Sequence, residues 1–219
     1  MTKLLAILRQ MRPADFLPDL LAFAGTVLCA LVFRWQAHDL IWSLWISSLT
    51  FGYAWMLAAF VRAIVTADGW AKLSAALGGL FTLTFFVLHF SMFHAVHGEF
   101  LNGFFPLQPQ LAFRPQHLTT LAPLALATYW PFILMTFVSR VRDFPWRHAP
   151  QNLGALMFMP YLNVIRMHVI IFVFAALDLA HLTRFAILPI LLFYFFPWRI
   201  FNRERKALAT KPVGSKPNI

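Results

Sequence analysis

Six apolar windows, each near the length of a membrane-crossing helix, follow one another along this 219-residue chain. They lie at about 17–35, 40–65, 74–98, 118–139, 154–178 and 184–200. A helix needs about 20 apolar residues to cross the hydrocarbon core of a bilayer. The pattern therefore predicts an all-α fold, a polytopic membrane helical bundle with six transmembrane helices over residues 1–200, followed by a basic tail at 201–219.

The composition excludes a water-soluble protein. Of all residues 60% are hydrophobic and only 12% are charged, so no segment is left for a separate soluble catalytic domain. The formal net charge of +10 would suggest a nucleic-acid partner in a soluble protein. In a membrane protein, basic residues gather on the cytoplasmic side, and we therefore predict no nucleic-acid partner.

The basic residues also predict how the chain is oriented. Fourteen of the 18 Lys and Arg fall in the two termini and in the segments at 62–73 and 140–153, all on one side of a six-span bundle. The other side holds Arg34, Arg114 and Arg184. This asymmetry predicts that both termini are cytoplasmic. We expect anionic lipid to contact the basic tail, and a homo-oligomer or a membrane complex is compatible with the sequence.

Prolines and one long connection interrupt the predicted helices. The segment 99–117 is expected to be a loop at the outer surface of the membrane. Pro123, Pro131, Pro160 and Pro189 lie in or near spans, where each removes a helix hydrogen bond. We therefore expect kinks in the fourth to sixth helices.

The histidines are the most informative polar residues. Seven of the eight fall in outer loops or in the outer halves of the helices at 74–98 and 154–178, and only His148 is predicted to be cytoplasmic. The seven are His38, His89, His94, His97, His117, His168 and His181. An ionisable group inside a membrane span is costly and usually serves a function.

Two groupings of these histidines are plausible. His94 and His97 are three residues apart and share a helix face, so Glu99 or His117 could complete a metal site with them. Alternatively, His89 and His168 lie about 21–23 Å from the predicted inner ends of two helices that run in the same direction. These two imidazoles are expected at one level.

The ligand types restrict the cofactor. Imidazole suits Cu, Zn and Fe, and Met92, one turn from His89, would favour copper because copper accepts thioether ligands. Two histidines at one depth on separate helices could instead ligate a haem b. Arg166, three residues after Asn163, needs a partner inside its span, and with Tyr161 these side chains could line a cavity beside the histidines.

Two segments resemble a known bacterial family. The run FFVLHFSMFHAVHGEFLNGFF at 85–105 and the run MPYLNVIRMH at 159–168 are similar to the two signature stretches of a polytopic membrane family known as domain of unknown function 6498. The resemblance implies a six-helix bacterial membrane protein with His89, His97 and His168 as its marked residues. It implies no activity. This chain departs from the family pattern at Ser47 and Ser48 and at Asn163.

The sequence leaves three functions open. The leading hypothesis is a multi-pass protein of the bacterial inner membrane in which His89, His97 and His168, with His94 as an auxiliary ligand, bind a transition metal ion from the outer side. The second is haem-dependent electron transfer. The third is a non-catalytic assembly or scaffold subunit with structural histidines. Whether the protein is an enzyme is not determined by these residues.

Overall fold

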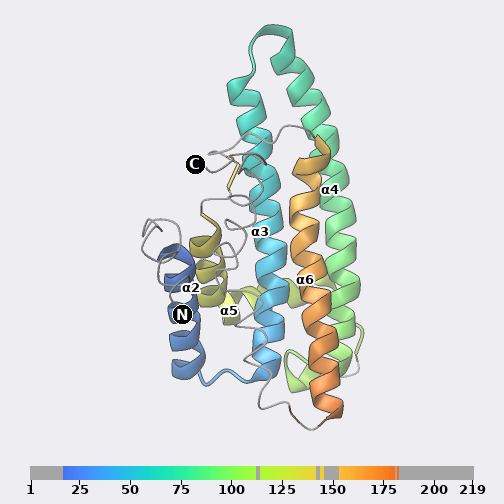
Figure 1. Cartoon of the computed structure of the whole chain (residues 1–219). Helices are drawn as coiled ribbons and strands as arrows, with labels where there is room; N and C mark the ends of the chain where they lie inside the picture. Colours follow the sequence, from blue (N-terminus) through green and yellow to red (C-terminus); the bar gives the residue numbers. More distant parts are fainter. Residues whose placement is uncertain (1–16, 112–113, 142–143, 146–152, 181, 183–219) are drawn as a thin grey trace, which may run out of the picture.

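The structure is a computed structural model that describes residues 17–111, 114–141, 144–145, 153–180 and 182. Within these residues the chain forms five α-helices and one 3-10 turn, and no strand is present (Figure 1). The elements are α2 (Leu17–Val32), α3 (Ala37–Thr66), α4 (Gly69–Phe104), η2 (Pro109–Leu111), α5 (Leu118–Arg140) and α6 (Leu153–Leu179). The all-α class predicted from the apolar windows is confirmed for this part of the chain.

Three of the helices, α3, α4 and α5, are long and apolar enough to cross a membrane. Leu17–Val32 and Pro160–Phe174 are shorter apolar helical stretches. Five of the predicted windows therefore overlap helices. The sixth window at 184–200 and the tail at 201–219 lie outside the described residues. The number of spans and the side on which the termini lie stay predictions.

Helix α4 extends further than predicted at both ends. The loop expected at 99–117 begins only at Phe105, whose backbone N donates to the carbonyl oxygen of Leu101 at 2.6 Å. Leu101 and Asn102 are buried, and the Asn102 amide donates to the carbonyl oxygen of Leu111 at 2.8 Å. The loop prediction was wrong for its first six residues because tertiary packing keeps this Gly- and Asn-containing stretch helical.

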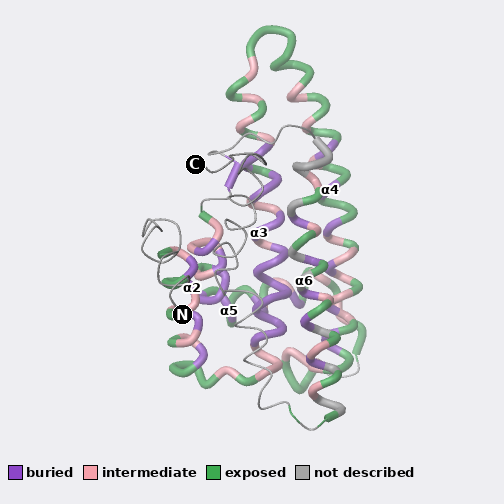
Figure 2. The backbone as a smooth tube through the Cα atoms, in the orientation of Figure 1, coloured by how far each residue is buried: buried purple, intermediate pink, exposed green. Residues whose placement is uncertain are grey.

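A tight turn joins α3 to α4. Only Ala67 and Asp68 separate the two helices, and Gly69 has φ +53°, a left-handed conformation that glycine adopts without strain. The hairpin projects beyond the other helices (Figure 1). Its tip is largely exposed, with Trp70 86% exposed (Figure 2). Because of this projection, the position of an α4 residue along the bundle axis, relative to α6, differs from the position that the predicted helix bounds imply.

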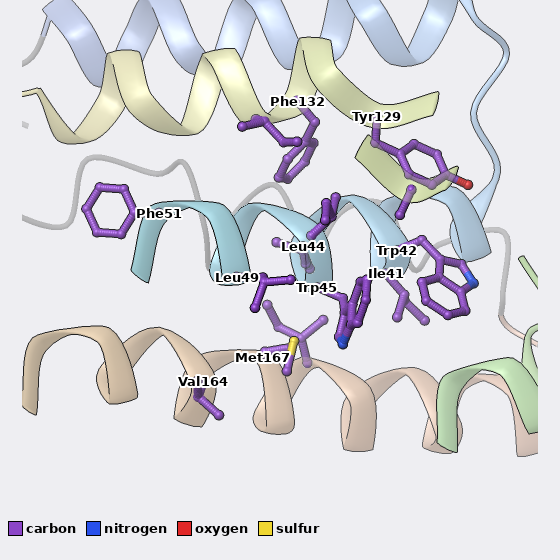
Figure 3. Close-up of a cluster of buried hydrophobic side chains, with 14 of the residues drawn as sticks. Ile41, Trp42, Leu44, Trp45, Leu49, Phe51, Tyr129, Phe132, Val164 and Met167 are labelled. Carbon is purple, nitrogen blue, oxygen red and sulfur yellow. The ribbon is translucent and has the colours of Figure 1, made fainter. Parts of the chain in front are cut away.

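Helix α3 lies at the centre of the bundle. It contacts α4, α5 and α6, whereas α2 packs mainly against α5. Every residue from Leu40 to Leu49 is buried (Figure 2). Figure 3 shows α3 side chains between Tyr129 and Phe132 of α5 and Val164 and Met167 of α6. A helix that is buried on all sides explains why this window shows no amphipathic pattern.

The α3–α4 contact is close because glycines face large rings. A Cβ atom on Gly98 would lie 2.9 Å from the Trp45 ring, and one on Gly52 would lie 2.5 Å from the Phe90 ring. Trp45 Nε1 also donates to the carbonyl oxygen of His94 at 3.1 Å. Trp42 Nε1 donates to the carbonyl oxygen of Phe105 at 2.7 Å. The rings therefore pack on the facing helix and bond to its backbone.

Helix α5 is kinked, as its prolines predicted. Tyr129, two residues before Pro131, has the non-helical values φ −113° and ψ 18°. The Tyr129 hydroxyl donates to Asp39 Oδ1 at 2.8 Å. Pro131 cannot donate a backbone hydrogen bond, which permits the local departure from helical geometry. Pro160 lies inside α6, and Pro189 is outside the described residues.

Candidate functional site

A pair of histidines lies between α4 and α6. The rings of His97 on α4 and His168 on α6 have their centroids 4.3 Å apart and stand nearly perpendicular, at 85°. Their Nε2 atoms face each other within hydrogen-bonding contact. Both side chains are partly buried. Two residues 71 positions apart in the sequence thus form one polar contact in an apolar bundle.

The other nitrogen of each ring is held by its own helix. His97 Nδ1 is 2.8 Å from the carbonyl oxygen of Phe93, and His168 Nδ1 is 2.7 Å from that of Val164. A carbonyl oxygen only accepts hydrogen bonds, so these contacts assign the ring hydrogen to Nδ1 in both residues. Both Nε2 atoms then carry lone pairs that face each other.

As two neutral imidazoles, the pair has one hydrogen fewer than its contacts require. Two carbonyl contacts and one Nε2–Nε2 contact require three hydrogens, whereas two neutral imidazoles supply two. A cation between the Nε2 atoms, either a proton or a metal ion, would remove the repulsion of the lone pairs. This arrangement of ring nitrogens is the chemical feature that the site offers.

The aromatic ring of Phe93 packs against both histidine rings. The Phe93 centroid lies 4.3 Å from that of His97 and 5.5 Å from that of His168. Phe93 is one turn before His97 on α4. It therefore supplies both the aromatic ring beside the pair and the carbonyl oxygen that His97 Nδ1 contacts. A low-dielectric surrounding strengthens whatever ionic contact the pair makes.

His94 faces the core rather than the pair. It is fully buried, its Nδ1 lies 3.0 Å from the carbonyl oxygen of Phe90, and its ring contacts those of Phe90 and Trp45. Its Nε2 has no hydrogen-bond partner among the described residues. No hydrogen bond joins His94 to His97 or to His168 among the described residues, so His94 takes no part in the Nε2–Nε2 contact.

His89 does not pair with His168. It is exposed, stacks on Phe85 at 5.6 Å and 7°, and lies 5.8 Å from the ring of Tyr161. The expectation that His89 and His168 lie at the same depth was wrong. It measured the depth of both residues from the predicted inner ends of their helices and assumed that these ends lie in one plane. The α3–α4 hairpin projects beyond α6, so His97, two turns after His89, reaches the level of His168.

The remaining predicted ligands are placed elsewhere. The Glu99 carboxylate accepts a hydrogen bond from the backbone N of Gln116, Met92 is 62% exposed, and His117 is an exposed residue before α5. In the part of the chain that the structure describes, no three or more His, Cys, Asp or Glu side chains lie together in a way that could hold one metal ion. The histidine cluster expected from the sequence is therefore a pair.

Of the predicted cavity residues, Tyr161 is placed. Its ring packs against Phe86 at 6.1 Å, Phe90 at 5.8 Å and His89 at 5.8 Å. Asn163 and Arg166 are residues of α6, and their side chains lie outside the described part of the structure. Tyr161 thus joins α6 to α4 about two turns before the histidine pair, on the side nearer the α3–α4 hairpin.

Two carboxylates that join helices, the buried Asp19 and the half-buried Asp39, were missed by the sequence reasoning. Asp39 Oδ1 accepts from Tyr129, and its Oδ2 accepts from the backbone N of Gln36 at 2.7 Å. Asp19, only 8% exposed, accepts from the Ser139 hydroxyl at 2.7 Å. The signal was present, because acidic residues at the ends of apolar windows need partners. Asp39 joins α3 to α5, and Asp19 joins α2 to α5.

Comparison with known proteins identifies a family but no activity. No curated protein and no solved structure matches the chain. Residues 16–199 match a family of unknown function (DUF6498), in agreement with the resemblance of the two histidine-containing segments. Since the match covers most of the chain, the protein belongs to this family of unknown function.

Proposed function

We propose that this protein is a multi-pass protein of the bacterial inner membrane in which His97 and His168 bind a single transition metal ion between α4 and α6. The proposal includes the six spans, the two cytoplasmic termini and an outward-facing site. It replaces the larger ligand set that the sequence suggested with the two residues whose ring nitrogens meet.

The observation that carries the proposal is the direction of the ring nitrogens. Metal-binding histidines usually donate the second ring N–H to a carbonyl or carboxylate, which fixes the tautomer and leaves the other nitrogen free to bind the metal. His97 and His168 both have this arrangement through Phe93 and Val164. Their Nε2 atoms also converge from two helices on one point.

The number of ligands favours monovalent copper. Zinc usually takes at least three protein ligands, and non-haem iron sites add a carboxylate to two histidines. A linear site with two neutral imidazoles is suited to Cu(I). A metal ion requires about 2 Å to each nitrogen, so the rings must separate slightly on binding.

The haem alternative fits the pair less well. A bis-histidine haem places the iron and the porphyrin plane between the two rings. His97 and His168 are in direct contact, and Phe93 packs against both, so α4 and α6 would have to move apart to admit a porphyrin. A non-catalytic scaffold role would use the pair only as a contact between helices.

Metal analysis of detergent-purified protein tests the proposal. We expect the wild-type protein to take up one copper ion per chain after incubation with Cu(I), and the redox-inert ion Ag(I) to raise its melting temperature. His97→Ala and His168→Ala should each abolish uptake. His89→Ala is the matched control, because it removes an exposed imidazole from the same helix.

Several results would overturn the proposal. Wild-type protein that binds neither ion would leave a shared proton as the cation between the rings. Equal uptake by wild type and His97→Ala would place the copper elsewhere. A strong Soret absorption in freshly purified protein would favour haem. Loss of complex assembly in the His168→Ala variant, without metal in either protein, would favour the scaffold role.

Topology is tested separately from metal binding. Reporter fusions that are active only in the cytoplasm should report a cytoplasmic location at both ends of the chain. Removal of residues 201–219 should weaken binding of the protein to anionic vesicles if the basic tail contacts lipid headgroups. An externally located C-terminus would contradict the six-span proposal without affecting the test of the histidine pair.

A further inference from the structure

The ring of Phe93 lies beside the point where His97 and His168 meet. Its centroid is 4.3 Å from that of His97 and 5.5 Å from that of His168, and the two histidine centroids are 4.3 Å apart. In a triangle with these sides, the midpoint between the histidine rings lies about 4.4 Å from the Phe93 centroid, within the ~6 Å at which a cation and an aromatic ring attract each other. An ion bound between the two Nε2 atoms would therefore lie next to this ring.

The Phe93 ring presents its face to that point. The planes of the Phe93 and His97 rings are inclined by only 30°, which is closer to parallel than to perpendicular. A metal ion lies in the plane of the imidazole that binds it, and for His97 this plane runs alongside the face of Phe93. The negative part of the aromatic quadrupole is on the ring face. A cation at the histidine pair is therefore on the attractive side of Phe93.

Phe93 is also placed to limit the number of ligands. Among the residues that the structure describes, it is the one ring that contacts both histidines. It fills one side of the pair with carbon, where a coordinated water molecule would otherwise lie. Zinc usually completes a set of four N, O or S ligands, whereas soft monovalent ions accept fewer. The ring therefore disfavours zinc at this position.

We propose that Phe93 is a specificity-determining residue of the metal site, whose ring face contacts the bound ion and favours a soft monovalent ion over zinc. This inference rests on the proposed function, because it requires an ion between His97 and His168. Monovalent copper and silver are polarisable, so an aromatic face replaces part of their hydration at little cost. A zinc ion at the same point loses a water ligand and gains no donor atom in exchange.

Fluorinated phenylalanines in place of Phe93 test the contact between ring and ion, in the full chain in detergent. Mono-, di- and trifluorinated phenylalanine keep the shape of the side chain and withdraw electron density from the ring face step by step. Binding of the redox-inert probe Ag(I) is measured by competition with a chelator of known affinity. We expect the Ag(I) affinity to fall with each fluorine, to about tenfold below the wild type in the trifluorinated protein. An affinity that does not depend on fluorination would contradict the inference.

Substitutions at Phe93 test the selectivity. Phe93→Leu removes the ring but keeps an apolar side chain, and it should lower the ratio of the Ag(I) affinity to the Zn(II) affinity about tenfold. Phe93→Trp should keep this ratio, and Ag(I) should quench the emission of the added tryptophan. Phe85 is the matched control, because it also precedes a histidine by one turn and stacks on His89 at 5.6 Å. Phe85→Leu should leave both affinities unchanged, and circular dichroism confirms that each variant is folded.

Failure of this inference is distinguishable from failure of the proposed function. Wild-type protein that binds neither Ag(I) nor Cu(I) would overturn the metal site, and the role of Phe93 with it. If the wild-type protein binds Ag(I) through His97 and His168 but Phe93→Leu keeps the same ratio of affinities, only the role of Phe93 is overturned. An equal loss in Phe85→Leu would have the same meaning, since it would show a general effect of removing a ring from α4.

Discussion

Helix α4 contacts α3 and α6 through different kinds of side chain. Toward α3 it presents Gly98 and the ring of Phe90, which fit against Trp45 and Gly52. Toward α6 it presents His97 and Phe93, which meet His168. The first contact is fully buried and bonded to backbone, whereas the second is partly buried and has two ring nitrogens that face each other. The comparison separates a contact that stabilises the fold from one that we propose binds a metal ion.

Trp45→Ala should have the largest effect on stability. The side chain is fully buried, and its removal also leaves the carbonyl oxygen of His94 without the indole donor. Removing a buried Trp typically costs about 3–5 kcal/mol. Titration with sodium dodecyl sulfate, followed by circular dichroism, measures the change in unfolding free energy.

Trp130→Ala is the control for this variant, because Trp130 is 57% exposed on α5. It should change the unfolding free energy by no more than about 0.5 kcal/mol. Equal losses in the two variants would show that the α3–α4 contact does not dominate stability, and the comparison would then fail.

The contact between α4 and α6 shows what the sequence can and cannot predict. The apolar windows predicted the helices, because length and hydropathy are local properties. The register of α4 against α6 is not local. It depends on a hairpin that projects beyond the bundle, and for that reason His89 was predicted to face His168 whereas His97 does.

The candidate site was predictable in residue type but not in number. His97 and His168 were named from the cost of burying imidazoles in a membrane. His94 was expected beside them because of its spacing, yet three residues along a helix correspond to a rotation of about 60°, and this turns His94 toward Trp45. Asp39 was missed because its partner Tyr129 comes from a kink 90 residues away.

Gly98→Val should destabilise the α3–α4 contact by overpacking. Its Cβ would lie 2.9 Å from the Trp45 ring and 3.1 Å from Leu121, and both neighbours are fully buried. Overpacking of this kind costs about 1–3 kcal/mol. Gly103→Val, on the same helix but with open space around its Cβ position, should show no such cost, because valine forms helices slightly better than glycine does. A similar cost at both positions would contradict close packing at Gly98.

Tyr129→Phe tests whether polar contacts outside the histidine pair also stabilise the fold. The variant loses the hydrogen bond to Asp39 but keeps the buried ring. We expect a loss of about 1–2 kcal/mol in unfolding free energy, because the acceptor is a carboxylate. Thr128→Val is the control, since the Thr128 hydroxyl only donates to the carbonyl oxygen of Leu124 within α5. An unchanged unfolding free energy in the Tyr129→Phe variant would mean that water replaces the hydroxyl.

His94→Leu should have the smallest effect and the most informative sign. The imidazole is fully buried with Nε2 unbonded among the described residues, so its removal relieves a desolvation cost. It also loses the Nδ1 contact with the Phe90 carbonyl oxygen, and leucine restores a similar volume of apolar packing. These changes oppose each other, and we expect a net change within about 1 kcal/mol of the wild type.

The same variant then distinguishes the two sides of α4 by copper binding. If His94 belongs to the α3 side, His94→Leu keeps both its stability and its copper, whereas His97→Ala loses copper with little loss of stability. A His94→Leu protein that folds normally but binds no copper would move His94 to the α6 side. The ligand set would then contain a third imidazole, and zinc would become as suitable as copper.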